Sequence, residues 1–135
     1  MRELLMMNKV LFSNIGCLIG SLFGDVDGIL YTLLLFIVAD YVTGLMAAVT
    51  ENQLSSQVGF KGILKKVVLL VLVAVAHSID MHVLKLGGAI RNTVIFFYLS
   101  NEGLSILENA VRIGLPIPEK LRDLLKSLKD GGSET

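Results

Sequence analysis

The stretch ILYTLLLFIVADYVTGLMAAV, residues 29–49, is apolar almost throughout and contains one charged residue, Asp40. An α-helix rises about 1.5 Å per residue, so about 20 apolar residues cross the hydrocarbon core of a membrane. The stretch is long enough, and it predicts a transmembrane helix over residues 29–50. A carboxylate inside such a helix is costly to bury and needs a partner from a neighbouring helix.

The composition of the whole chain agrees with a membrane location. Of its 135 residues, 53% are hydrophobic and 18% are charged, and the mean hydropathy is +0.71. Soluble domains are typically about 45–50% apolar and about 25% charged. The formal net charge of zero gives no basis for nucleic-acid binding, and the single Cys17 has no partner for a disulfide and no zinc-site spacing around it. We therefore expect an integral membrane protein with no cofactor, metal or catalytic site.

Three further segments complete the expected architecture. Residues 64–85 and 91–113 predict transmembrane helices, provided that their polar residues face protein or water. Residues 1–24 form an amphipathic segment and a possible first membrane helix, and residues 117–135 form a cytoplasmic tail with a short helix. The sequence thus predicts one membrane domain over residues 1–135, an all-α integral membrane protein with three to four transmembrane helices that forms homo-oligomers.

The amphipathic segment allows two interpretations. Its apolar residues share one helical face, so the segment can lie in the membrane interface with that face toward the acyl chains. Alternatively the segment spans the membrane. Gly16, Gly20 and Gly24 would then form a seam of small residues that lets a second helix approach closely.

The distribution of Lys and Arg indicates which ends face the cytoplasm, because cytoplasmic loops carry an excess of these residues. One cluster follows the second segment and another lies in the tail. Both fall in the cytoplasm with three spans or with four, and four spans give the larger excess. We expect these basic residues to lie at the membrane surface, where they attract anionic lipid. They are Lys61, Lys65, Lys66, Lys120, Arg122, Lys126 and Lys129.

Polar residues recur along the 91–113 segment at helical intervals and share one face. A charge at the middle of a bilayer costs about 2.5–3.5 kcal/mol, so this polar stripe cannot face lipid. The stripe either joins helices inside the membrane or becomes lined with water when subunits assemble. It consists of Tyr98, Asn101, Glu102, Ser105, Glu108, Asn109 and Arg112.

The second segment also carries a small polar face. Asp40 shares this face with Thr43, Gly44 and Ala48. Small residues permit close helix contact, and a buried carboxylate then needs a donor from the helix that approaches.

The third segment contains His77 and Asp80, three residues apart. A His–Asp pair at this spacing can transfer protons, because His titrates near neutral pH. It can equally be a satisfied buried pair near the outer end of the span.

The order of several short motifs is similar to that of a known family. The run NEGLSILEN at residues 101–109 is followed by GLPIP at 114–118, DYVTG occupies residues 40–44, and KG and KK stand at 61–62 and 65–66. With these motifs, residues 30–130 resemble the toxin-secretion and phage-lysis holin family of Gram-positive bacteria and their phages.

The resemblance implies a function. Members of the family accumulate in the bacterial cytoplasmic membrane and assemble into lesions that release a cell-wall endolysin or, in some clostridia, a large protein toxin. The expected partners are therefore other copies of the chain, membrane lipid and the hydrolase or toxin that passes. Two alternatives stay open: a small ion or proton channel or transporter subunit, and a membrane anchor for a soluble partner.

Overall fold

A computed structural model describes residues 1–131, apart from the side chains of 125, 126 and 128–131. Over this part all regular secondary structure is helical, and the described residues form no strand. The helix bounds are α1 Arg2–Phe23, α2 Gly28–Thr50, α3 Ser56–Ser78, η1 Ile79–Leu84, α4 Ala89–Ile113 and α5 Glu119–Gly131. The π-helical turn η1 continues α3 without a break.

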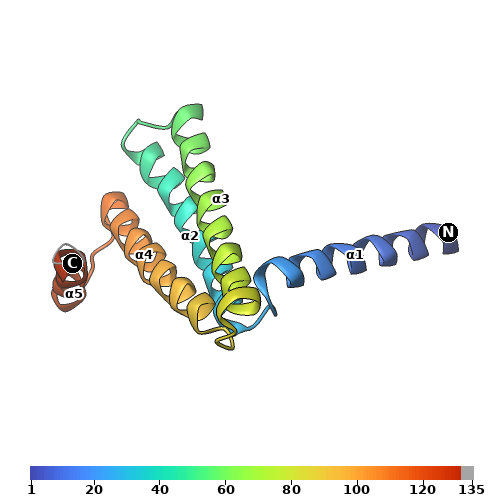
Figure 1. Ribbon diagram of the computed structural model, residues 1–135. Coiled ribbons are helices and arrows are strands. Elements are labelled where there is room, and N and C mark those ends of the chain that lie inside the picture. The colour runs from blue at the N-terminus through green and yellow to red at the C-terminus, as the bar shows by residue number, and fades with distance from the viewer. Residues whose placement is uncertain (132–135) are drawn as a thin grey trace.

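Helices α2, α3 and α4 form a bundle, and α1 and α5 leave it at opposite ends (Figure 1). Helices α2 and α3 are antiparallel, and α4 packs mainly along α2. The apolar core lies at the end of the bundle nearer α1, since it joins the start of α2, the second half of α3 and the start of α4. Its buried residues are Leu30, Leu33, Ile37, Leu69, Val73 and Ile95.

Side-chain caps fix where the two central helices begin. The Asp27 carboxylate accepts a hydrogen bond from the Leu30 backbone N–H at 3.1 Å, and the Ser55 hydroxyl accepts one from Val58 at 3.2 Å. Such caps satisfy backbone N–H groups that have no partner in the first turn. The cap at Ser55 starts α3 earlier than the expected 64–85, so the Lys-rich segment lies inside the helix.

Three described helices are long and apolar enough to cross a membrane: Arg2–Phe23, Gly28–Thr50 and Ser56–Leu84. Much of the apolar surface of the last two faces outward, as expected for lipid contact; Val38, Val42 and Val71 are each about half exposed. Helix α4 does not reach this hydropathy on its own. It packs on α2 and α3 with Glu102 and Asn109 inward, whereas Asn101 and Glu108 of the same polar face are exposed.

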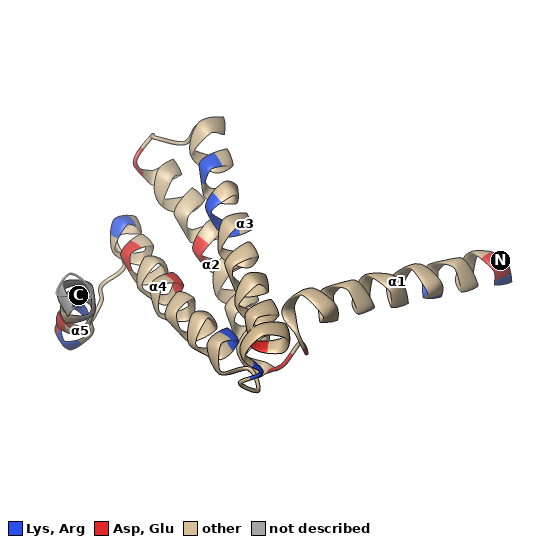
Figure 2. Ribbon diagram, viewed as in Figure 1, with Lys and Arg blue, Asp and Glu red and all other residues tan. Residues whose placement is uncertain are grey.

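Figure 2 shows how the charges divide along the bundle. Lys and Arg gather at the start of α3 and the end of α4, close to the α2–α3 turn. At the other end, acidic residues occupy the α1–α2 connector, and basic residues lie near them at the start of α4 and in the loop before it. Helix α5 follows α4 after Gly114, whose φ of 98° is a backbone conformation that favours glycine at a helix end.

Candidate functional site

Three helices meet at a buried ion cluster in the half of the bundle nearer the α2–α3 turn. Lys66 of α3 donates hydrogen bonds to the carboxylates of Asp40 on α2 and Glu102 on α4. The exposed fractions of the three side chains are 16%, 11% and 9% respectively. One ammonium group thus forms ion pairs with two carboxylates. Because all three groups are largely buried, leaving one of these charges unpaired would cost much free energy.

Asn109 completes the polar contacts of Asp40. Its amide nitrogen donates to an Asp40 carboxylate oxygen at 3.0 Å, to the Asp40 carbonyl at 3.2 Å and to the Thr43 hydroxyl at 3.1 Å. Gly44 lies next to this contact, and a Cβ built there would lie 3.5 Å from the same nitrogen, an ordinary van der Waals distance. The cluster therefore joins α2 to α4 both by charge and by directed hydrogen bonds.

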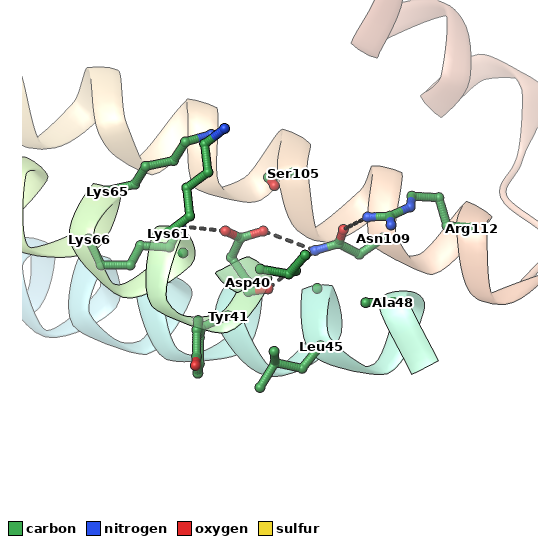
Figure 3. A pocket seen from close by; sticks show the side chains of 13 residues that line it. Asp40, Tyr41, Leu45, Ala48, Lys61, Lys65, Lys66, Ser105, Asn109 and Arg112 are labelled. Carbon is green, nitrogen blue, oxygen red and sulfur yellow. Dashed lines mark hydrogen bonds and ion pairs between the residues drawn. The ribbon is translucent and has the colours of Figure 1, made fainter. Parts of the chain in front are cut away.

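A cleft of about 340 Å³ opens beside the cluster, between α3 and α4 and above α2 (Figure 3). Lys61 and Lys65 line it from α3, and Ser105 and Arg112 line it from α4. Lys61 and Lys65 are exposed, whereas Lys66 turns inward to Asp40. Water that fills the cleft from the α2–α3 turn would reach the edge of the ion cluster.

An ion pair at the mouth of the cleft ties the end of α4 to the end of α2. The Arg112 guanidinium donates to both carboxylate oxygens of Glu51, at 3.0 and 2.7 Å, and to the Asn109 side-chain oxygen at 3.2 Å. The hydrogen bonds from Arg112 lower the pKa of Glu51 below its usual value. Because this pair is exposed, its contribution to stability is small.

A second polar centre, at the other end of the bundle, is built around Arg91 of α4. Its buried guanidinium donates to the Phe23 carbonyl at 2.6 Å, to the Asp25 carbonyl at 2.9 Å and to the Asp27 carboxylate at 3.0 Å. These bonds fix the α1–α2 connector against the start of α4. Gly24 lies inside this connector with φ 77°, and a Cβ there would come within 2.9 Å of the His77 ring.

Asp80 supports the same centre from the π-helical turn. Its side chain is almost fully buried, and one carboxylate oxygen accepts from the Arg91 backbone N–H at 2.6 Å. The other oxygen has no hydrogen-bond partner among the described residues. The carboxylate thus satisfies an N–H group in the first turn of α4, and its partner is Arg91 rather than His77.

The pairing of Asp27 with Arg91 predicts an acid-sensitive contribution to stability. The hydrogen bond from Arg91 lowers the pKa of the Asp27 carboxyl below its ordinary 3.8. A carboxyl with a lowered pKa stabilises the fold above its ordinary pKa, and this stabilisation is lost as the pH falls through the folded value. We expect Asp27→Asn, which keeps a capping side chain, to lower the free energy of unfolding at pH 7 by up to about 1 kcal/mol.

Unfolding in detergent micelles between pH 7 and pH 3 measures this difference. The gap between the native chain and Asp27→Asn should shrink below about pH 4. A gap that stays constant over the whole range would contradict the assignment.

The expected polar stripe divides between two sides of α4. Glu102 and Asn109 are buried in the cluster, and Tyr98 is half-buried against the apolar core. Ser105 lines the cleft, and the remaining members, Asn101, Glu108 and Arg112, are exposed. Within one copy, part of the stripe therefore joins helices and part faces outward.

The small residues expected at helix contacts fall into two groups: some contact a neighbouring helix within one copy and others do not. Gly44 and the buried Ala48 lie where α2 meets its neighbours, and Gly24 packs on His77 and Arg91. A Cβ at Gly16 or Gly20 would meet nothing within 4 Å, so a seam at these two glycines makes no contact within one copy.

Four of the basic residues expected at the membrane surface are exposed within one copy of the chain. Lys61 and Lys65 are exposed on α3, and Lys120 and Arg122 are exposed on α5. Lys66 is not at the surface: it lies on the inward face of α3, and its long side chain reaches the two carboxylates. The side chains of Lys126 and Lys129, and residues 132–135, lie outside the described part of the chain.

Two functional residues were missed by sequence reasoning, Lys66 as the partner of Asp40 and Arg91 as the centre of the connector. The capping signal at Ser55 could have shown that the Lys-rich segment lies inside α3, but not which of its lysines reaches Asp40. No comparable signal points to Arg91. Its carbonyl partners belong to residues 23 and 25, and backbone groups leave no trace in a sequence.

Comparison with known proteins gives consistent matches. The model of the bacteriophage holin family matches residues 17–130. An uncharacterized protein of Listeria monocytogenes, Lmo0128, is 52% identical over 110 residues, which is 82% of this chain and 78% of the relative. The probable holin of Bacillus phage phi105 is 34% identical over 113 residues, which is 84% of this chain and 82% of the relative. No solved structure matches the chain.

Proposed function

The chain belongs to the bacteriophage holin family, and from this premise we propose that many copies assemble in the bacterial cytoplasmic membrane into lesions. A cell-wall hydrolase, or a large protein toxin, would leave the cell through these lesions. Membership in the family points to a non-enzymatic membrane protein. A single bundle of this size cannot enclose a hole that passes a folded protein, so the lesion requires many subunits.

The observation that carries the proposal is the polar cleft beside the ion cluster. The outward face of the bundle is apolar, yet between α3 and α4 charged side chains line a cleft of about 340 Å³. A lesion wall needs an apolar side toward lipid and a polar side toward water. We propose that assembly widens this cleft, so that Lys61, Lys65 and Ser105 become part of the water-facing wall.

The proposed orientation places the α2–α3 turn and the C-terminus in the cytoplasm. Lys61, Lys65 and Arg112 line the cleft near that turn, and the positive-inside rule favours the cytoplasm for such a group of basic residues. Helices α2, α3 and α4 then cross the membrane. Helix α4 can cross because Glu102 and Asn109 are satisfied inside the bundle by Lys66 and Asp40.

Inducible expression in a bacterium that carries a cytosolic reporter enzyme of endolysin size tests the proposal. We expect abrupt growth arrest with release of the reporter. Glu102→Leu leaves Lys66 paired with Asp40, so the protein should reach the membrane at a normal level, but release should fall at least about tenfold. Ser100→Leu, at an exposed position two residues away and outside the polar stripe, is the matched control and should release the reporter normally.

A narrow ion channel is the second candidate, and the charged groups beside the cleft favour it. Such a channel would leak ions while the reporter stays inside the cells. That result would contradict release of folded protein. A membrane anchor would cause neither ion leakage nor release.

A further inference from the structure

Helix α1 has no cover within one copy of the chain. It is 22 residues long, and none of its residues is buried. Apolar side chains such as Leu11 and Leu18 are more than half exposed. A helix with so much open apolar surface is unstable in water, so something outside the described bundle must cover its apolar face.

The direction of α1 suggests what that cover is. Helix α1 runs crosswise to α2 and α3 and leaves them at the end of the bundle (Figure 1). This exit is fixed rather than free, because the Arg91 guanidinium holds the carbonyls of Phe23 and Asp25 on either side of Gly24. If α2 and α3 stand across a bilayer, α1 lies along the surface of that bilayer.

An apolar groove in the corner between α1 and α3 shows which face of α1 is turned toward the bilayer. The groove has a volume of about 530 Å³, and α1 lines it with Leu22 and Phe23. Val67, Val71 and Ala74 line it from the outward face of α3. Leu22 belongs to the same apolar helical face as Leu11. The apolar face of α1 and the lipid-facing side of α3 therefore open toward the same acyl chains.

We propose that α1 is an interfacial helix whose apolar face binds the outer leaflet of the membrane, with its polar face toward water. Arg2 and Lys9 lie on that polar face, within reach of lipid phosphate groups. The inference rests on the proposed orientation, in which the α1–α2 connector lies outside the cell. The chain then crosses the membrane three times, through α2, α3 and α4.

Labelling of Cys17 can test this arrangement, because Cys17 is the single cysteine of the chain and lies on the polar face of α1. Intact cells, sampled before growth arrest, are treated with a membrane-impermeant maleimide. We expect Cys17 to react from outside, as should Ser21→Cys in a Cys17→Ser background. Ile15→Cys and Leu22→Cys in that background, on the apolar face, should react at least about tenfold more slowly.

Three outcomes would overturn the proposal. Equal reaction on both faces would place α1 in water. Slow reaction on both faces, with Arg2→Cys reached only in inverted vesicles, would show that α1 spans the membrane. Face-dependent reaction from the cytoplasmic side alone would place α1 on the inner leaflet.

A Ser127→Cys variant in the Cys17→Ser background separates the possible causes of failure. If Ser127→Cys reacts only in inverted vesicles, the proposed orientation holds and a failure belongs to α1 alone. If it reacts in intact cells, the orientation itself is wrong. Reporter release is measured on the same variants, so the lesion-forming function is tested independently of where α1 lies.

Discussion

Lys66→Met is expected to lower the free energy of unfolding in detergent micelles by about 3–5 kcal/mol. The substitution keeps a long side chain but leaves the carboxylates of Asp40 and Glu102 buried together without a cation. Removal of one partner from a buried ion pair costs more than the pair contributes, because the remaining charge is isolated from water. Here two charges of the same sign are left facing each other.

Loss of Lys66 should also change the position of α4 in the membrane. This helix is not apolar enough to cross alone, and its buried carboxylate loses its partner in the variant. We expect a C-terminal topology reporter to move from the cytoplasm to the outer side in a large fraction of the molecules.

Lys65→Met is the matched control for both measurements, since Lys65 is exposed and lies beside Lys66 in the chain. It should change stability by no more than about 0.5 kcal/mol. The triple variant Lys66→Met, Asp40→Asn, Glu102→Gln has no charge left to isolate and should recover most of the loss. A single Lys66→Met variant as stable as the Lys65→Met control would show that the cluster does not hold the helices together.

Arg91→Met is expected to have the second largest effect, a loss of about 2–3 kcal/mol. The guanidinium is buried and binds two backbone carbonyls and a carboxylate of the α1–α2 connector. Methionine fills similar space but donates no hydrogen bond, so the Phe23 and Asp25 carbonyls lose this charged donor. Asp80 keeps its bond because it accepts from the Arg91 backbone.

Arg112→Met is the matched control for Arg91→Met. It removes an exposed arginine that also binds a carboxylate, and it should cost less than about 1 kcal/mol. Unfolding of both variants under the same conditions compares a buried with an exposed guanidinium on one helix. Equal losses would mean that the connector is held by its own backbone conformation rather than by Arg91.

The central span could be predicted closely from the sequence. The apolar run from residue 29 and the capping residue Asp27 fix α2 at Gly28–Thr50, against an expected 29–50. Asp40 was recognised as needing a partner, but the partner could not be named. Lys66 stands in a segment rich in lysine, and only the position of α3 in space distinguishes it from Lys65 beside it.

The spacing of polar residues along α4 predicted their surroundings only in part. Intervals of three and four residues show that polar side chains share a face, but not what that face touches. In the folded chain Glu102 points into the bundle, whereas Asn101, one residue earlier, is exposed. The hydrogen bonds of Arg91 could not be predicted from the sequence, because they join residues 68 and 66 positions apart through backbone carbonyls.

The same separation has a consequence for synthesis. A ribosome produces α1 first, yet Arg91, which fixes the way α1 leaves the bundle, is made only after α2 and α3 are complete. Loops of this length close late, since contacts between distant residues form only after the intervening chain is ordered. Helix α1 therefore receives its direction only after α2 and α3 have been made, and a nascent chain that stops before residue 91 carries an α1 with no assigned direction.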